Sequence, residues 1–121
     1  MTQKRQGMEM SDKEVAPVVG VEEIRNELER EVSSLAEEIN NIDSEHIEEF
    51  LSRVIDILVI KELGKNNVVG FSILLTTGGP NIMFEYSRGV AEIKGTWGGI
   101  TVSKSVNIEK AEEILEYLNS M

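Results

Sequence analysis

The amino-acid sequence predicts an α+β domain, ααββββα, in which helices pack on one face of a four-stranded antiparallel meander. Two patterns indicate this. Apolar residues recur three or four positions apart in residues 21–42 and 108–118, which is typical of amphipathic helices. Between residues 68 and 103 apolar and polar residues alternate between glycine-containing turns, which is typical of strands. A chain of 121 residues with 40% apolar content suits one domain with one core.

The first helix is predicted over residues 21–42. Its apolar residues fall in a single stripe: Val21, Ile24, Leu28, Val32, Leu35, Ile39 and Ile42. Their spacing is also that of a coiled-coil seam, but about three heptads are too few for a free-standing coiled coil. We therefore expect the stripe to pack against a second helix of the same domain.

The second helix is predicted from Ser44 to Leu63. Asp43 is placed as its N-cap, and Gly64 follows its last apolar residue as a C-terminal signal. Residues 54–60 read V-I-D-I-L-V-I, and this β-branched run leaves a strand as the alternative there. We favour the helix because the two end signals frame one continuous element.

Four strands are predicted at residues 68–76, 82–86, 90–97 and 100–103. Gly98-Gly99 suits a two-residue hairpin turn, because such turns need positive φ at both positions. The turn lengths set one register for the whole meander, with these opposite pairs: Leu75–Ile82, Ile73–Phe84, Phe84–Ile93, Tyr86–Ala91, Gly95–Val102 and Trp97–Ile100. All of these pairs place apolar residues on one face, which a random register rarely does.

The chain ends in a predicted helix, Ile108–Leu118, with Asn107 as its N-cap. At the other end, residues 1–18 lack any periodicity and are predicted to form a flexible arm. Residues 19–121 are then the single α+β domain.

The net charge of −10 is unevenly distributed. Residues 21–62 hold thirteen acidic and four basic residues, whereas residues 63–106 hold two acidic and four basic residues. Acidic helices repel nucleic acid and anionic lipid, so we expect neither as a partner. The chain has no cysteine, which excludes disulfides and thiolate sites and fits a cytoplasmic location. No residue pattern indicates a cofactor.

Two glycine-rich turns form the candidate ligand site. In an up-and-down meander the first and third turns emerge at the same end, which brings Thr76, Thr77, Gly78, Gly79 and Asn81 near Trp97, Gly98 and Gly99. Backbone N–H groups in such turns bind anions, and a tryptophan adds a stacking face. The alternative is that the glycines only satisfy turn geometry and Trp97 belongs to the core.

Other chemical signals are sparse. His46, the single histidine, has Asp43 and Glu49 three positions away, but a metal site needs further ligands from another helix. Asp56 is the carboxylate that interrupts the apolar run. On the outer face of the sheet, Leu74 opposite Met83 forms a small apolar patch for a protein contact. No catalytic or metal-binding residues are predicted.

These observations favour a non-enzymatic binding or assembly module that contacts a protein partner or a second copy of itself. One alternative is a small-ligand or anion-binding protein, or an enzyme, that uses the turns at 76–81 and 97–99. Another is an acidic inhibitor of a basic or nucleic-acid-binding protein.

Overall fold

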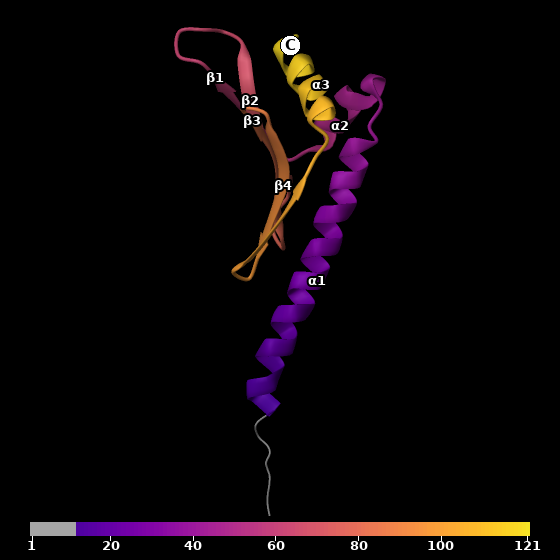
Figure 1. Cartoon of the computed structure of the whole chain (residues 1–121), viewed down its shortest axis with the longest axis vertical. Helices are drawn as coiled ribbons and strands as arrows, with labels where there is room; N and C mark the ends of the chain where they lie inside the picture. Colours follow the sequence, from indigo (N-terminus) through magenta and orange to yellow (C-terminus); the bar gives the residue numbers. More distant parts are fainter. Residues whose placement is uncertain (1–11) are drawn as a thin grey trace, which may run out of the picture.

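The structure is a computed structural model that describes the backbone of residues 12–121 and the side chains of residues 20–121. Its strands form one antiparallel sheet in the order β1-β2-β3-β4-β5, and the helices lie on one side of it (Figure 1). The elements are α1 (Asp12–Asn40), the 3-10 turn η1 (Ser44–His46), α2 (Ile47–Arg53), β1 (Asp56–Lys61), β2 (Val68–Thr76), β3 (Asn81–Ser87), β4 (Val90–Trp97), β5 (Ile100–Ser105) and α3 (Ile108–Asn119). Residues 1–11 of the arm predicted at 1–18 lie outside the described residues, and residues 12–18 form the start of α1.

The antiparallel meander is confirmed for β2 to β5. Its pairs include Ile73–Phe84, Phe84–Ile93, Tyr86–Ala91, Gly95–Val102 and Trp97–Ile100, as the turn lengths predict. The first pair differs, because an irregularity between Leu74 and Thr76 sets Thr76 opposite Ile82. Gly98 and Gly99 have φ of 58° and 82°, the positive values that the two-residue turn requires.

The prediction of one helix from Ser44 to Leu63 is wrong beyond Arg53. The backbone becomes extended at Val54, where ψ is 162°, and Asp56–Lys61 is a fifth strand that pairs with β2. Two factors favour the strand over the helix. The β-branched side chains suit an extended backbone, and pairing with β1 satisfies the backbone hydrogen-bonding groups of β2. Gly64, with φ of 80°, lies in the β1–β2 loop, and the Asp43 side chain makes no capping hydrogen bond.

The apolar stripe of α1 packs on β4 and β5, and not on a second helix as expected. Leu28, Val32 and Ile39 are fully buried in this contact layer. Gly95 on β4 makes the close approach possible, since a Cβ there would lie 2.8 Å from a methyl carbon of Val32. The stripe is therefore buried against the sheet and is not available to form a coiled coil.

The last helix, α3, packs on β2 and β4, with Ala111 and Ile114 fully buried. Asn107 caps it as predicted, because its Oδ1 accepts hydrogen bonds from the N–H groups of Glu109 (2.8 Å) and Lys110 (3.4 Å). At the other end of α3, the Asn119 amide bonds to both backbone groups of Val68. The cap thus satisfies N–H groups at the start of the helix, and the Asn119 amide ties its end to β2.

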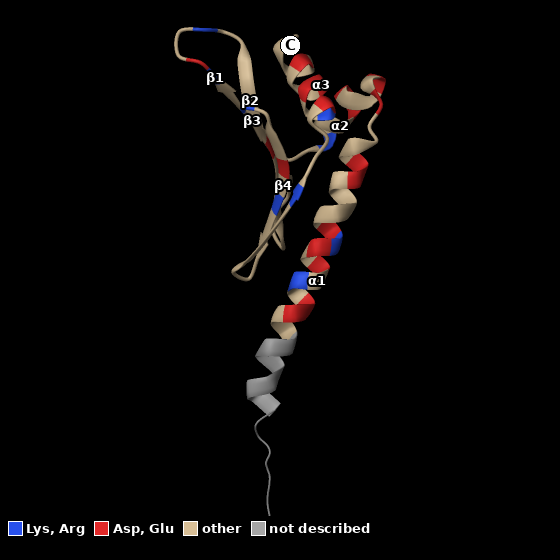
Figure 2. Cartoon of the chain, in the orientation of Figure 1, with Lys and Arg blue, Asp and Glu red and all other residues tan. Residues whose placement is uncertain are grey.

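The charge of the chain follows its layers. Figure 2 shows acidic residues spread along α1, α2 and α3, whereas the sheet is largely free of charge. Among the helices that the structure describes, none combines the length and the apolar composition needed to cross a bilayer.

Candidate interaction surface

The edge strand β1 exposes its apolar residues on both faces. Leu58 and Ile60 lie opposite Ser72 and Gly70 on the outer face, and they are 60% and 45% exposed. Val59 lies on the helix-covered face, opposite Phe71. We call Ile57–Ile60, the apolar interior of this strand, the β1 edge.

The β1 edge is open because the helix layer lies over the other strands. α1 packs on β4 and β5, and α3 packs on β2 and β4. As a result Val59 is 43% exposed, although its neighbour Phe71 in the ladder is 1% exposed. On the inner face of β1, Ile57 is therefore partly buried against the core, whereas Val59 lies beside the core and stays exposed.

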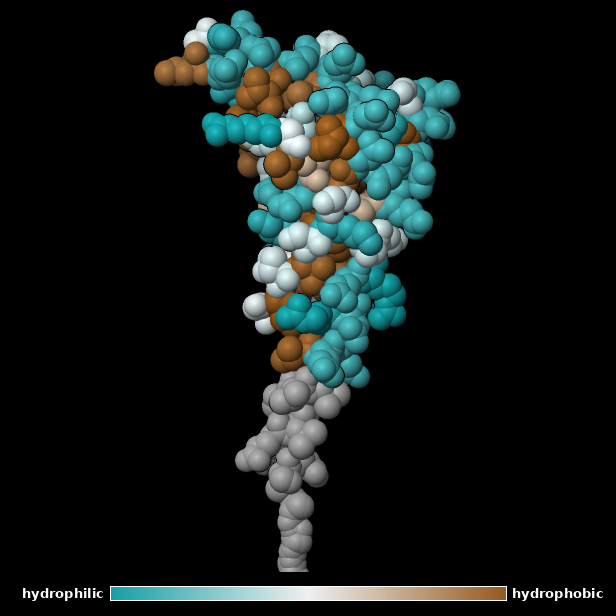
Figure 3. All heavy atoms as spheres, in the orientation of Figure 1, coloured by the Kyte–Doolittle hydropathy of each residue, from teal (hydrophilic) through white to brown (hydrophobic). Residues whose placement is uncertain are grey.

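Exposed apolar side chains concentrate around this strand. Five of the ten exposed large apolar residues of the described chain fall within nine consecutive positions: Ile55, Leu58, Val59, Ile60 and Leu63. Figure 3 shows hydrophobic atoms standing out from the tip of the loop that joins β1 to β2. Scattered apolar residues are normal on a surface, but this many exposed in one short segment favour an interaction site there.

The patch predicted from Leu74 and Met83 adjoins the β1 edge. The two residues lie opposite each other on the outer face, where both are half-buried. Leu74 is also paired with Asp56 of β1, which places Leu74 diagonal to Leu58 across the ladder. The predicted Leu74–Met83 pair therefore lies beside the β1 edge, and its role in a protein contact stays a prediction.

The opposite edge of the sheet is built differently. β5 exposes Thr101, Ser103, Lys104 and Ser105, and α1 runs beside it. Lys104 Nζ lies 3.4 Å from the Ser33 hydroxyl of α1. Polar side chains, a lysine and a neighbouring helix are the usual protection of an edge strand against pairing.

The two glycine-rich turns do emerge at the same end of the sheet (Figure 1), as their places in the meander require. Their hydroxyl groups are engaged within the first turn, where Thr76 Oγ1 donates to the Pro80 carbonyl and Thr77 Oγ1 bonds to Asn81 Oδ1. Trp97 is 37% exposed at the rim and so is not a core residue. These contacts stabilise the turn, and a ligand role for it stays a prediction.

The remaining chemical candidates do not converge. His46 lies 3.7 Å from the Asp43 carboxylate, and both side chains are exposed. Within residues 20–121 no three histidine or carboxylate side chains are grouped to hold a metal ion. Asp56 is exposed at the start of β1, where its carboxylate accepts a hydrogen bond from the Ile57 N–H.

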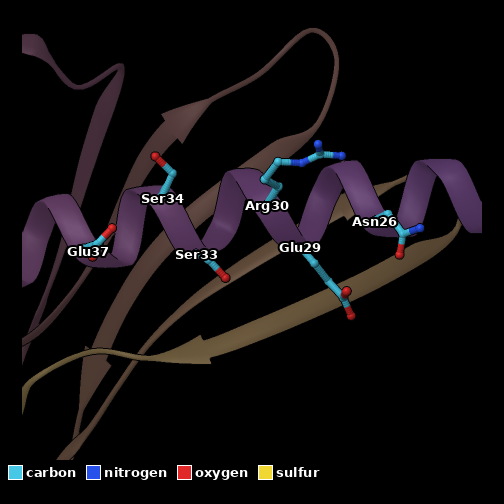
Figure 4. A pocket seen from close by; sticks show the side chains of 6 residues that line it. All are labelled: Asn26, Glu29, Arg30, Ser33, Ser34 and Glu37. Atoms are coloured by element: carbon cyan, nitrogen blue, oxygen red, sulfur yellow. The ribbon is translucent and has the colours of Figure 1, made fainter.

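A shallow hollow lies along the outward side of α1 (Figure 4). Its lining side chains all belong to this one helix and point in different directions: Asn26, Glu29, Arg30, Ser33, Ser34 and Glu37. Catalysis and tight binding of small molecules need polar groups that converge from several elements. This hollow does not have that arrangement.

Comparison with known proteins adds no relative. Family models, curated proteins and solved structures were each searched, and none matches the chain. A function for the chain is therefore inferred from its own surface.

The sequence prediction missed the β1 edge because it assigned residues 56–61 to a helix. The β-branched run V-I-D-I-L-V-I was the signal for a strand there.

Proposed function

We propose that the protein is a non-enzymatic assembly module that binds an extended polypeptide segment along the β1 edge. The observation that carries this proposal is an edge strand whose Leu58, Val59 and Ile60 are each at least 43% exposed in the folded chain. An uncovered edge offers a row of unpaired backbone groups, and a bound strand extends the sheet by pairing with them.

The energetics support binding along a strand. Fully burying an aliphatic side chain contributes about 1.5–3 kcal/mol, so completing the burial of these three side chains contributes a few kcal/mol. Association itself costs about 4–15 kcal/mol. Apolar contact alone therefore does not suffice, and the backbone hydrogen bonds of an added strand supply the alignment and the remaining affinity.

The alternatives have less support. A ligand site at turns 76–81 and 97–99 has its threonine hydroxyls already bonded within the turn. The acidic-inhibitor alternative rests on the charge of the helices, which also serves solubility.

A synthetic peptide tests the proposal. We expect a fluorescein-labelled, nine-residue peptide of alternating Thr and Val residues to bind, with NMR shifts confined to β1 and its neighbour β2. The double variant Leu58→Lys/Ile60→Lys should weaken binding at least tenfold, because it places two charges on the outer face of the edge.

A matched control separates this from a general effect of charge. Thr101→Lys/Ser103→Lys puts the same two charges on the outer face of β5, and it should leave peptide binding unchanged. A peptide with proline at alternate positions should not bind, since proline lacks the N–H that pairs with an edge. Equal binding by both double variants, or no binding of the Thr–Val peptide to a chain that light scattering shows to be monomeric, would contradict the proposal.

A further inference from the structure

We infer that the segment that occupies the β1 edge is β1 of a second copy of this chain. The two five-stranded sheets then join as one ten-stranded antiparallel sheet. This inference rests on the proposed function, because it names the partner of the same edge.

The difference between the two edges selects this partner. If β1 of one copy paired with β5 of the next, the contact would be head-to-tail and would grow into an open filament. The polar side chains of β5 and the adjacent α1 oppose that contact. Pairing of β1 with β1 uses the same surface on both copies, so it closes at two chains and leaves only protected edges.

Symmetry restricts the register. Two identical antiparallel strands at a sheet edge are related by a two-fold axis perpendicular to the sheet, so outer-face residues meet outer-face residues. An axis at Leu58 sets Leu58 opposite itself, and an axis at Val59 sets Leu58 opposite Ile60 of the other copy. Both registers bring apolar residues together on the two faces of the joined sheet. The first sets Asp56 opposite Ile60 at the ends of the contact, and the second sets Ile57 opposite Lys61.

Charge also favours this edge. Each copy has a net charge of −10, so two copies approach most easily where charge is low. β1 carries one acidic and one basic residue, Asp56 and Lys61. The acidic helix α1 lies over β4 and β5, and seven strand spacings separate the two β4 strands in the joined sheet, roughly 30 Å. That separation is about three Debye lengths at moderate salt, so repulsion between the two α1 helices is screened. The acidic helix α3 packs on β2 and β4, and three strand spacings, roughly 14 Å, separate the two β2 strands, so repulsion between the two α3 helices is screened less.

Light scattering on the full chain is the first test. We expect a mass of twice 13.5 kDa for the wild type and 13.5 kDa for Leu58→Lys/Ile60→Lys at the same concentration. Thr101→Lys/Ser103→Lys should remain a dimer, and circular dichroism should show that both variants are folded. A wild-type chain that stays monomeric at millimolar concentration overturns the inference.

The absence of cysteine allows a second test. Single cysteines are placed at Ile57, Leu58, Val59 and Ile60 in turn, with Ser103→Cys on β5 as the control. A residue on the axis faces its own copy at about 5 Å between Cα atoms, within disulfide range, whereas the next residue is separated by about 8 Å. We expect one maximum of disulfide-linked dimer, at Leu58 or Val59, and at least tenfold less from Ser103→Cys.

The outcomes separate this inference from the proposed function. If the Thr–Val peptide binds at β1 but the chain is monomeric, the proposed function stands and the second copy is excluded. If the chain is dimeric but no β1 cysteine cross-links above the Ser103→Cys control, the dimer uses another surface and the inference is wrong.

Discussion

At the scale of single residues, Gly95 shows why one missing side chain matters. It lies on the helix-covered face of β4, and a Cβ there would come within 2.9 Å of methyl carbons of both Val32 and Leu28. Those two residues are fully buried on α1. The glycine therefore sets the distance between α1 and the sheet.

Gly95→Ala should destabilise the fold by about 1–3 kcal/mol, because α1 or its side chains must shift to admit the methyl group. Urea unfolding followed by circular dichroism measures this. Gly79→Ala is the control, since a Cβ at Gly79 has nothing within 4 Å, and we expect a change within about 0.5 kcal/mol. Equal effects of the two substitutions would contradict the packing argument.

A second residue-scale contact ties the loop after α1 to α3. Lys110, whose side chain is 13% exposed, lies 3.0 Å from the Glu113 carboxylate and also donates to the Ile42 carbonyl. The hydrogen bond and charge of Lys110 lower the pKa of Glu113 below its ordinary 4.5, against a weaker opposing effect of burial, and Ser44 adds a further hydrogen bond. The ionised form is thus favoured in the folded state.

This contact predicts a loss of stability in acid. A lowered folded pKa contributes stability that is present above pH 4.5 and is lost as the pH falls through the folded value. Thermal unfolding between pH 6 and pH 3 should therefore show a shallower acid decline for Glu113→Gln than for the wild type. Glu116→Gln, an exposed carboxylate on the same helix, should follow the wild-type curve. A Glu113→Gln curve parallel to the wild type would refute the assignment.

At the scale of elements, the side-chain amide of Asn119 holds α3 to the sheet, because it bonds to a backbone N–H and a backbone C=O as a neighbouring strand would. Asn119 Oδ1 accepts the Val68 N–H at 2.6 Å, and Asn119 Nδ2 donates to the Val68 carbonyl at 2.9 Å. Val68 begins β2, where Lys61 of β1 is its ladder partner. The end of α3 therefore fixes the start of the strand that carries the β1 edge.

Asn119→Ala should reduce stability by about 1–3 kcal/mol, because it leaves two partly buried backbone groups without their partner. Hydrogen exchange should localise the effect to the first residues of β2 and the end of α3. Asn66→Ala, in the exposed β1–β2 loop, is the matched control and should change stability by less than about 0.5 kcal/mol. A uniform loss of protection against hydrogen exchange across the whole sheet would contradict a local role for the Asn119–Val68 contact.

At the scale of the whole molecule, the fold is one-sided. The acidic helices cover one face of a sheet of low charge (Figure 2), and that layer stops short of β1. Burial on the covered face is close to complete, with Phe84, Ile82 and Ile93 each at 0% exposure. A second strand beside β1 would pack its side chains against Leu58, Val59 and Ile60, which this layer leaves exposed. That contact is the physical basis of the assembly proposed above.

The sequence by itself predicted the four strands at 68–76, 82–86, 90–97 and 100–103, their pairing, the capped last helix and the common end of the two glycine-rich turns. These features depend on local patterns: side-chain alternation, turn lengths and a cap. The pairing of Leu74 with Met83 was predicted correctly because the ladder register determines it, and their role in a protein contact stays a prediction.

Residues 54–60 were decided only by the tertiary structure. Their apolar run suits a buried helix as well as a strand, because periodicity cannot separate the two in a short segment. The open backbone groups of β2 select the strand, since pairing with β1 satisfies groups that a helix would leave unpaired. The tertiary structure also decided the destination of the α1 stripe. The helix expected as its partner has only seven residues, Ile47–Arg53, and the missing side chain at Gly95 lets α1 approach β4 closely.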